Sequence, residues 1–195
     1  MEILILAVVT LPLLTALFLK VANRFLNELL TNFITINAAL LSVAVSFFMF
    51  GYLLLDKFKP IKFELFEWYP SPQIIFEFYL DGLSGVMMIL ISGLSLVIQL
   101  FSTSYMSKDE KYTKYFEYFN FFVFSMLLLV LSGNFLVMFF GWELVGLSSY
   151  LLISFWYEKN SAAKAGNKAF ILNRIGDFGF LIGLMMILNY FETFN

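Results

Sequence analysis

Six long apolar segments divide this chain, and short charged segments separate them. A helix that crosses a membrane needs about 20 mostly apolar residues, because it rises about 1.5 Å per residue through a core of about 30 Å. Segments of that kind lie at about residues 3–19, 30–55, 83–105, 115–131, 135–157 and 165–190. The pattern therefore predicts an all-α polytopic membrane protein with about six transmembrane helices, which form a single membrane domain over residues 1–195.

The connection between the second and third apolar segments has a different pattern. Apolar and polar residues alternate from Ile61 to Leu65, as they do in a half-buried strand. Pro70-Ser71-Pro72 then interrupts regular structure, and residues 73–80 are again strand-like. We predict an external, hairpin-like loop here, followed by Asp81 as the N-cap of the third helix.

The fourth break is the least obvious in the sequence. From Tyr118 to Tyr157 the one charged residue is Glu143, and this stretch is too long for a single crossing. Ser132-Gly133-Asn134 is the favoured turn, because all three residue types are common in turns. The alternative is a turn near Gly141, which would place Glu143 at the membrane surface.

Basic residues are distributed unevenly among the connections. The connection after the second predicted helix contains Lys57, Lys59 and Lys62. The connections after the first, third and fifth helices, together with the start of the sixth, contain the larger basic set: Lys20, Arg24, Lys108, Lys111, Lys114, Lys159, Lys164 and Lys168. By the positive-inside rule, the larger set faces the cytoplasm or the mitochondrial matrix, and Met1 and the hairpin face the opposite side.

Composition supports the membrane interpretation and excludes several functions. The chain is 61% hydrophobic and 13% charged, whereas soluble domains are about 45–50% apolar and about 25% charged. It contains neither cysteine nor histidine, which excludes disulfides, thiolate metal sites and histidine-ligated haem. A net charge of −2 without a basic patch argues against nucleic-acid binding. No basic region precedes the first apolar segment, so we expect a membrane helix there rather than a presequence.

Three ionisable residues are expected at membrane depth, where each is a functional hypothesis by default. Glu143 lies nine residues beyond Asn134, about 13 Å along the helix and close to the middle of the membrane. If a cationic partner approaches Glu143 and moves away again, the carboxyl group can take up and release a proton and is a gateable proton site. The alternative is a structural carboxyl group that is hydrogen-bonded to a neighbouring helix. Arg174 and Asp177 are three residues apart and share one helix face, so they form either an internal ion pair or a proton-carrying pair.

Further polar residues flank these three. Lys164 and Lys168 lie near the start of the sixth helix, where they either extend to lipid headgroups or supply protons to Glu143. Ser148 and Ser149 follow Glu143 on the fifth helix. Their hydroxyl groups either hold water along a proton path or form ordinary hydrogen bonds between helices.

Several motifs in order along the chain resemble one family. Residues 139–153 read FFGWELVGLSSYLLI and are followed by FWY at 155–157. Residues 173–179 read NRIGDFG, and DGLS at 81–84 and STSYM at 102–106 precede both motifs. In these motifs the chain resembles chain 5 of NADH–ubiquinone oxidoreductase (respiratory complex I), a family of antiporter-like, proton-pumping membrane-arm subunits.

The resemblance implies a function and an environment. It implies that Glu143 is the glutamate on which proton pumping depends, and that Arg174 and Asp177 form the charged motif of the sixth helix. It implies that the chain itself binds no cofactor, while the complex uses NADH, FMN, iron–sulfur clusters and ubiquinone elsewhere. The implied partners are other membrane-arm subunits and membrane lipids. The resemblance favours a location of the chain in the mitochondrial inner membrane over one in a bacterial plasma membrane.

The chain departs from this family in length. Family members are longer, and the lysine that pairs with the fifth-helix glutamate lies on a helix after the sixth. This sequence has no other mid-membrane lysine that could replace it, so we expect it to be the N-terminal part of a unit that a second chain completes. Two alternatives stay open: a structural or assembly module without its own proton path, and a component of a cation/proton antiporter.

Overall fold

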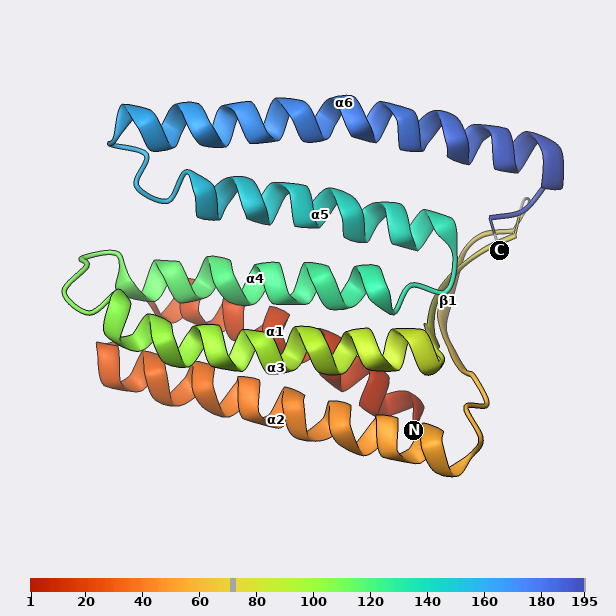
Figure 1. Ribbon diagram of the computed structural model, residues 1–195, viewed down its shortest axis with the longest axis horizontal. Coiled ribbons are helices and arrows are strands. Elements are labelled where there is room, and N and C mark those ends of the chain that lie inside the picture. Colours follow the sequence, from red (N-terminus) through yellow and green to blue (C-terminus); the bar gives the residue numbers. More distant parts are fainter. Residues whose placement is uncertain (71–72, 195) are drawn as a thin grey trace.

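The computed structural model describes residues 1–70 and 73–194. Within them the chain is mostly helical, which confirms the predicted class, and it also contains one antiparallel hairpin (Figure 1). The elements in chain order are α1 (Glu2–Ala22), α2 (Glu28–Leu55), β1 (Ile61–Pro70), β2 (Gln73–Leu80), α3 (Gly82–Tyr105), α4 (Tyr112–Val130), α5 (Phe135–Ile153) and α6 (Asn160–Phe191). Ser71 and Pro72, where we predicted the break between the strands, lie outside the described residues.

The helices lie side by side and alternate in direction (Figure 1). The N-terminus, the hairpin, the α4–α5 turn and the last described residues lie at one end of the bundle. The α1–α2, α3–α4 and α5–α6 connections lie at the other end, so the larger basic set is gathered there. The orientation that the positive-inside rule assigns to these two ends stays a prediction.

Five of the helices in the described part of the chain are long and apolar enough to cross a membrane. The remaining helix is α4, which contacts α1, α2, α3 and α5. It buries polar residues such as Thr113 and Asn120, and the Asn120 side-chain amide donates to the Phe116 carbonyl oxygen at 2.9 Å. Because neighbouring helices rather than lipid surround much of α4, it tolerates polar residues that a lipid-facing helix would not.

Side chains in the preceding loops cap three of the helices. Asn27 accepts from the Leu30 N–H at 2.9 Å, and Asn134 accepts from the Val137 N–H at 2.9 Å. Asp81 accepts from the Ser84 N–H at 2.8 Å, while the Ser84 hydroxyl accepts from the Asp81 N–H at 2.7 Å. The predicted N-cap of the third helix is therefore confirmed, and it takes the form of a reciprocal capping box.

The fifth and sixth helices begin and end at different residues from those predicted. α5 ends at Ile153 rather than near residue 157, and α6 begins at Asn160 rather than near residue 165. The apolar residues after Ile153 are loop residues: Phe155 is 6% exposed and lies edge-on against Tyr115 of α4, with ring centroids 5.7 Å apart. An apolar run alone cannot distinguish a helix from a loop that is buried against its neighbours.

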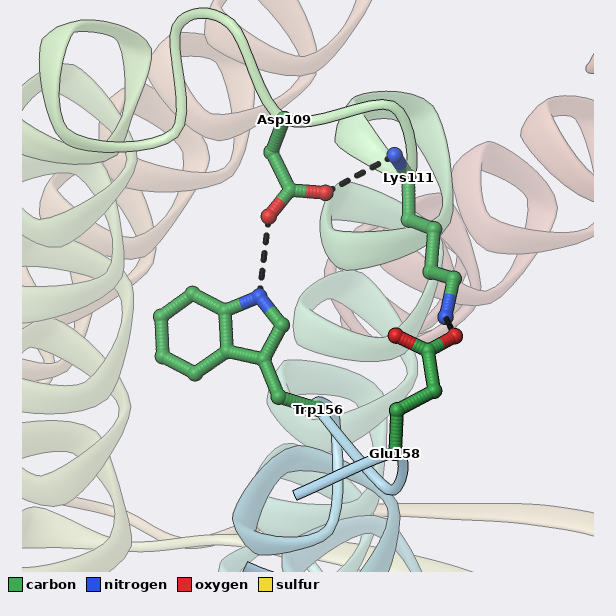
Figure 2. Close-up of polar contacts among 4 residues, drawn as sticks. All are labelled: Asp109, Lys111, Trp156 and Glu158. Atoms are coloured by element: carbon green, nitrogen blue, oxygen red, sulfur yellow. Dashed lines mark hydrogen bonds and ion pairs between the residues drawn. The ribbon is translucent and has the colours of Figure 1, made fainter.

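The α3–α4 and α5–α6 loops are tied together at the basic end of the bundle (Figure 2). The Trp156 indole N–H donates to one carboxylate oxygen of Asp109 at 2.8 Å, and the Lys111 backbone N–H donates to the other at 2.8 Å. The Lys111 ammonium group lies 2.5 Å from a carboxylate oxygen of Glu158. These bonds join the α5–α6 connection to the remainder of the bundle.

At the opposite end, β2 is joined to the α4–α5 turn, which lies at the predicted Ser132-Gly133-Asn134. The Tyr79 N–H donates to the Leu131 carbonyl oxygen at 2.8 Å, and the Gly133 N–H donates to the Glu77 carbonyl oxygen at 2.9 Å. The Asn134 amide donates to the Ile75 carbonyl oxygen at 2.7 Å. The turn thus covers an edge of the hairpin that would otherwise expose unpaired backbone groups.

Gly141 allows α5 to approach α4 closely. A Cβ atom added there would lie 2.6 Å from the Leu129 Cα atom, a backbone atom that cannot rotate away. We expect Gly141→Ala to destabilise the bundle by about 1–3 kcal/mol, since overpacking forces the backbone to shift. Thermal unfolding in detergent measures the effect. The matched control is Gly51→Ala, because an added Cβ at Gly51 meets nothing within 4 Å. Equal melting temperatures for the two variants would contradict the close approach.

Glu77 is a buried carboxyl group in the hairpin, 3% exposed, and its Oε1 atom has no hydrogen-bond partner among the described residues. Burial raises its pKa above 4.5; Glu64 acts in the same direction and Lys62 opposes it. Because the folded state favours the protonated form, this carboxyl group stabilises the fold below its unfolded pKa, and that contribution is lost as pH rises through the folded value.

We therefore expect Glu77→Gln to be more stable than the native chain at neutral pH and to lose this part of the pH dependence. Thermal unfolding followed from pH 4 to neutrality tests this expectation. Glu67→Gln, at an exposed position of the same hairpin, is the control and should follow the native chain. A lower melting temperature for Glu77→Gln at neutral pH would show that the ionised carboxylate is the form that the fold prefers.

Candidate functional site

The charged residues expected at membrane depth meet where α5 packs against α6. These two helices contact each other along the outer side of the bundle (Figure 1). Glu143 comes from α5, and Arg174 and Asp177 come from α6. A Cβ atom added at Gly146 would lie 3.5 Å from the Asn173 side chain, an ordinary van der Waals distance, so the two helices are in direct contact beside the charges.

One guanidinium group contacts both carboxylates. Nη1 of Arg174 forms an ion pair with Oε2 of Glu143, and the same nitrogen lies 3.5 Å from Oδ2 of Asp177. The Glu143 and Asp177 side chains are 19% and 8% exposed, whereas the Arg174 side chain is 45% exposed. The two carboxylates are thus mostly enclosed by the helices, and the cation reaches them from a more open position.

The predicted Arg174–Asp177 proximity is present, but the prediction omitted the contact between Arg174 and Glu143. The spacing of three residues indicated that Arg174 and Asp177 share a helix face. Spacing within one helix gives no information about which residue of a neighbouring helix lies opposite. When all three groups are ionised, the cluster sums to −1, and one proton on either carboxylate makes it neutral.

Trp142 belongs to the same cluster, although the residue pattern assigned it no role. Its indole N–H donates to Oδ1 of Asp177 at 2.9 Å, and its ring stacks on Phe180 at a centroid distance of 6.2 Å. Its position next to Glu143 was a usable signal, because an indole N–H at membrane depth needs an acceptor. This hydrogen bond from α5 holds the Asp177 carboxylate of α6 in place.

Arg174 also lies over an aromatic ring. Its Cζ atom is 4.9 Å from the centroid of Phe170, one turn earlier on α6. A guanidinium group in this position gains a cation–π interaction of about 0.5–1 kcal/mol at an exposed site. The ring offers Arg174 a resting position that does not depend on either carboxylate.

The remaining candidate residues lie outside this cluster. Ser148 is fully buried, and its hydroxyl donates to the Val145 carbonyl oxygen at 3.1 Å, while Ser149 is half-buried. Lys164 and Lys168 are exposed in the first turns of α6. Lys168 precedes Arg174 by six residues, about 9 Å along the helix. No ion pair within 4.0 Å joins these lysines to a carboxylate in the part of the chain that the structure describes.

The comparisons with known proteins agree with the motifs. Residues 68–116 match the family described as NADH-Ubiquinone oxidoreductase (complex I), chain 5 N-terminus. Residues 132–195 match the family described as NADH:quinone oxidoreductase/Mrp antiporter, TM. The second match includes Glu143, Arg174 and Asp177, so the whole charged cluster lies within the region that the family shares.

Individual relatives extend the similarity over almost the whole chain. NADH-quinone oxidoreductase subunit L of Rickettsia bellii is 36% identical over 190 residues, which cover 96% of this chain and 29% of that protein. NADH-ubiquinone oxidoreductase chain 5 of Acanthamoeba castellanii is 37% identical over 186 residues, which cover 94% of this chain and 27% of that protein. The chain thus spans less than a third of the length of these relatives.

Solved structures share the fold. A chain of the archaeal membrane-bound sulfane sulfur reductase superposes with a TM-score of 0.86 at 22% identity, covering 100% of this chain and 39% of the other. A chain of respiratory complex I from Thermus thermophilus superposes with a TM-score of 0.72 at 16% identity, covering 96% and 38%. The protein therefore belongs to the antiporter-like membrane-subunit family of NADH:quinone oxidoreductase, whose members are named subunit L or chain 5, and it corresponds to the N-terminal part of those longer relatives.

Proposed function

We propose that this chain contributes to proton translocation in the membrane arm of respiratory complex I, coupled to electron transfer from NADH to ubiquinone. The observation that carries the proposal is the cluster in which Arg174 contacts both Glu143 and Asp177 between α5 and α6. Paired charges at membrane depth are costly to maintain and are typical of proton paths. The family membership supports the same activity, since the relatives are subunits of NADH:quinone oxidoreductase.

The cluster acts as a switch in this proposal. Glu143 stays ionised while Arg174 lies beside it, and it takes up a proton when the guanidinium group moves away. That movement is small, because the same nitrogen of Arg174 already lies 3.5 Å from Asp177. Trp142 holds Asp177 in place, so the mobile member is Arg174, which is also the most exposed of the three.

The proton path from the basic side runs through α5 and α6. Lys164 and Lys168 lie at the entrance, on the first turns of α6, and Ser148 and Ser149 lie one to two turns beyond Glu143 on α5. Water molecules bridging these hydroxyl groups would connect the entrance to Glu143.

In the proposal, other polypeptides supply the remaining parts of the proton-pumping unit. The relatives are more than three times as long. We propose as a partner a second chain whose helices complete the proton path beside α6. The other partners are neighbouring membrane-arm subunits and lipids. NADH, FMN, iron–sulfur clusters and ubiquinone are bound by other subunits, and this chain binds none of them. We place the chain in the mitochondrial inner membrane. The relative named chain 5, from Acanthamoeba castellanii, supports this location.

We expect Glu143→Gln to reduce proton uptake per NADH oxidised by about tenfold or more, because a positioned proton-transfer group contributes about 10²–10⁴-fold. The measurement is NADH-driven acidification of sealed membrane vesicles. Native-gel separation with peptide mass spectrometry of the NADH-oxidising band shows in parallel whether the chain is assembled. Glu67→Gln, in the external hairpin, is the matched control and should pump normally.

Each other result of this experiment has a definite meaning. Normal pumping in assembled Glu143→Gln complexes would exclude Glu143 as the proton carrier and would favour a structural role for the chain. Absence of the native chain from the NADH-oxidising band would exclude complex I and would favour a cation/proton antiporter. Loss of the band in the variant alone would assign Glu143 to assembly rather than to transport.

We expect Trp142→Phe to weaken the cluster through Asp177. The variant keeps an aromatic ring on Phe180 but removes the N–H, which leaves the buried carboxylate short of one donor at a cost of about 1–3 kcal/mol. A double-mutant cycle with Asp177→Asn, read by thermal unfolding of the assembled protein, measures the coupling between the two residues. Strictly additive effects would contradict a direct hydrogen bond.

A further inference from the structure

A groove lies apart from the charged cluster, between α1, α4 and α5. Its volume is about 570 Å³. The helix ends that line it lie where the α1–α2 and α3–α4 connections are found (Figure 1). α1 contributes its last turns and α4 its first turns, while Leu151 of α5 closes the third side. Leu151 is eight residues beyond Glu143, about 12 Å along α5, so the groove is separate from the proton site.

The lining of the groove changes from charged to apolar along its length. Lys20 lies at the end of α1, and Leu13 lies seven residues earlier, about 10 Å deeper. On α4, Lys114 lies in the first turn, and Phe121 lies seven residues later, again about 10 Å deeper. Both helices therefore present a cation at the end of the bundle and apolar surface toward its middle.

More cationic than anionic side chains line the groove. Two ammonium groups, those of Lys20 and Lys114, line it together with one carboxylate, that of Glu117, so the lining sums to +1. Neither ammonium group has a carboxylate within 4.0 Å in the described part of the chain. Lys114 is half-buried and lies 5.6 Å from the centroid of the Tyr118 ring, which restricts its side chain to the groove.

We propose that this groove binds an anionic phospholipid. Its phosphate lies between Lys20 and Lys114, where one negative charge balances the lining, and an acyl chain extends along Leu13, Leu17 and Phe121. A basic pocket between helices at the positive end of a membrane protein suits such a headgroup.

Photochemical crosslinking of lipids in the native assembly tests this proposal. The purified complex is reconstituted into phosphatidylcholine vesicles that contain either phosphatidylglycerol or phosphatidylcholine with the same diazirine on the acyl chain. After illumination, peptide mass spectrometry quantifies lipid adducts on the segments that contain Leu17 and Phe121. We expect about fivefold more adduct from phosphatidylglycerol, which corresponds to about 1 kcal/mol for one net basic charge near the lipid surface.

Substitutions of opposite sign make the test specific. Lys20→Gln with Lys114→Gln should abolish the preference, whereas Glu117→Gln, which removes the one carboxylate of the lining, should increase it about fivefold. Damage to the fold cannot produce that increase, so the Glu117 variant separates lipid binding from misfolding. Lys57→Gln with Lys59→Gln, at the opposite end of the bundle, is the matched control and should leave the preference unchanged.

Two results would overturn the proposal. Equal adduct from the two lipids, unaffected by the lysine substitutions, would show that the groove takes bulk lipid without selecting charge. Absence of adducts from both lipids, with adducts present on the exposed face of α6, would show that another protein segment covers the groove.

Discussion

A carboxylate at the centre of a membrane requires a cation or a hydrogen-bond donor within reach, because lipid cannot solvate it. In this chain α5 and α6 bring two carboxylates, Glu143 and Asp177, to one guanidinium group. The cluster requires the two helices to lie close together and in one rotational register. Gly141 permits the approach of α5 to α4, so the position of the cluster depends on packing that extends into the centre of the bundle.

Both ends of the bundle hold α5 and α6 in this register. At one end, the α4–α5 turn is hydrogen-bonded to β2 through Tyr79 and Gly133. At the other end, Trp156 and Asp109 join the α5–α6 loop to the α3–α4 loop. Direct bonds at both ends restrict sliding of α5 along its axis. Such restriction suits the proposed switch, in which one guanidinium group moves a few ångströms between two acceptors while the helices remain in place.

The proposed proton site and the proposed lipid site share one arrangement of charges. Each combines two charges of one sign with one of the other, which leaves a net charge for a mobile or external ion to balance. At the cluster the excess is negative, and in the proposed function a proton neutralises it. At the groove the excess is positive, and in the proposal a lipid phosphate neutralises it. α5 contributes to both sites, through Glu143 at mid-membrane and Leu151 near the basic end.

The local pattern of residues was enough to predict the helices, the hairpin and the α4–α5 turn, because run length, alternation and turn chemistry are properties of neighbouring residues. It also placed Glu143 near the middle of its helix. The pattern did not predict that Arg174 contacts Glu143 or that Trp142 donates to Asp177. Nor did it predict that α5 ends at Ile153. Each of these features depends on which faces of separate helices meet, and only the packing of the helices against one another decides that.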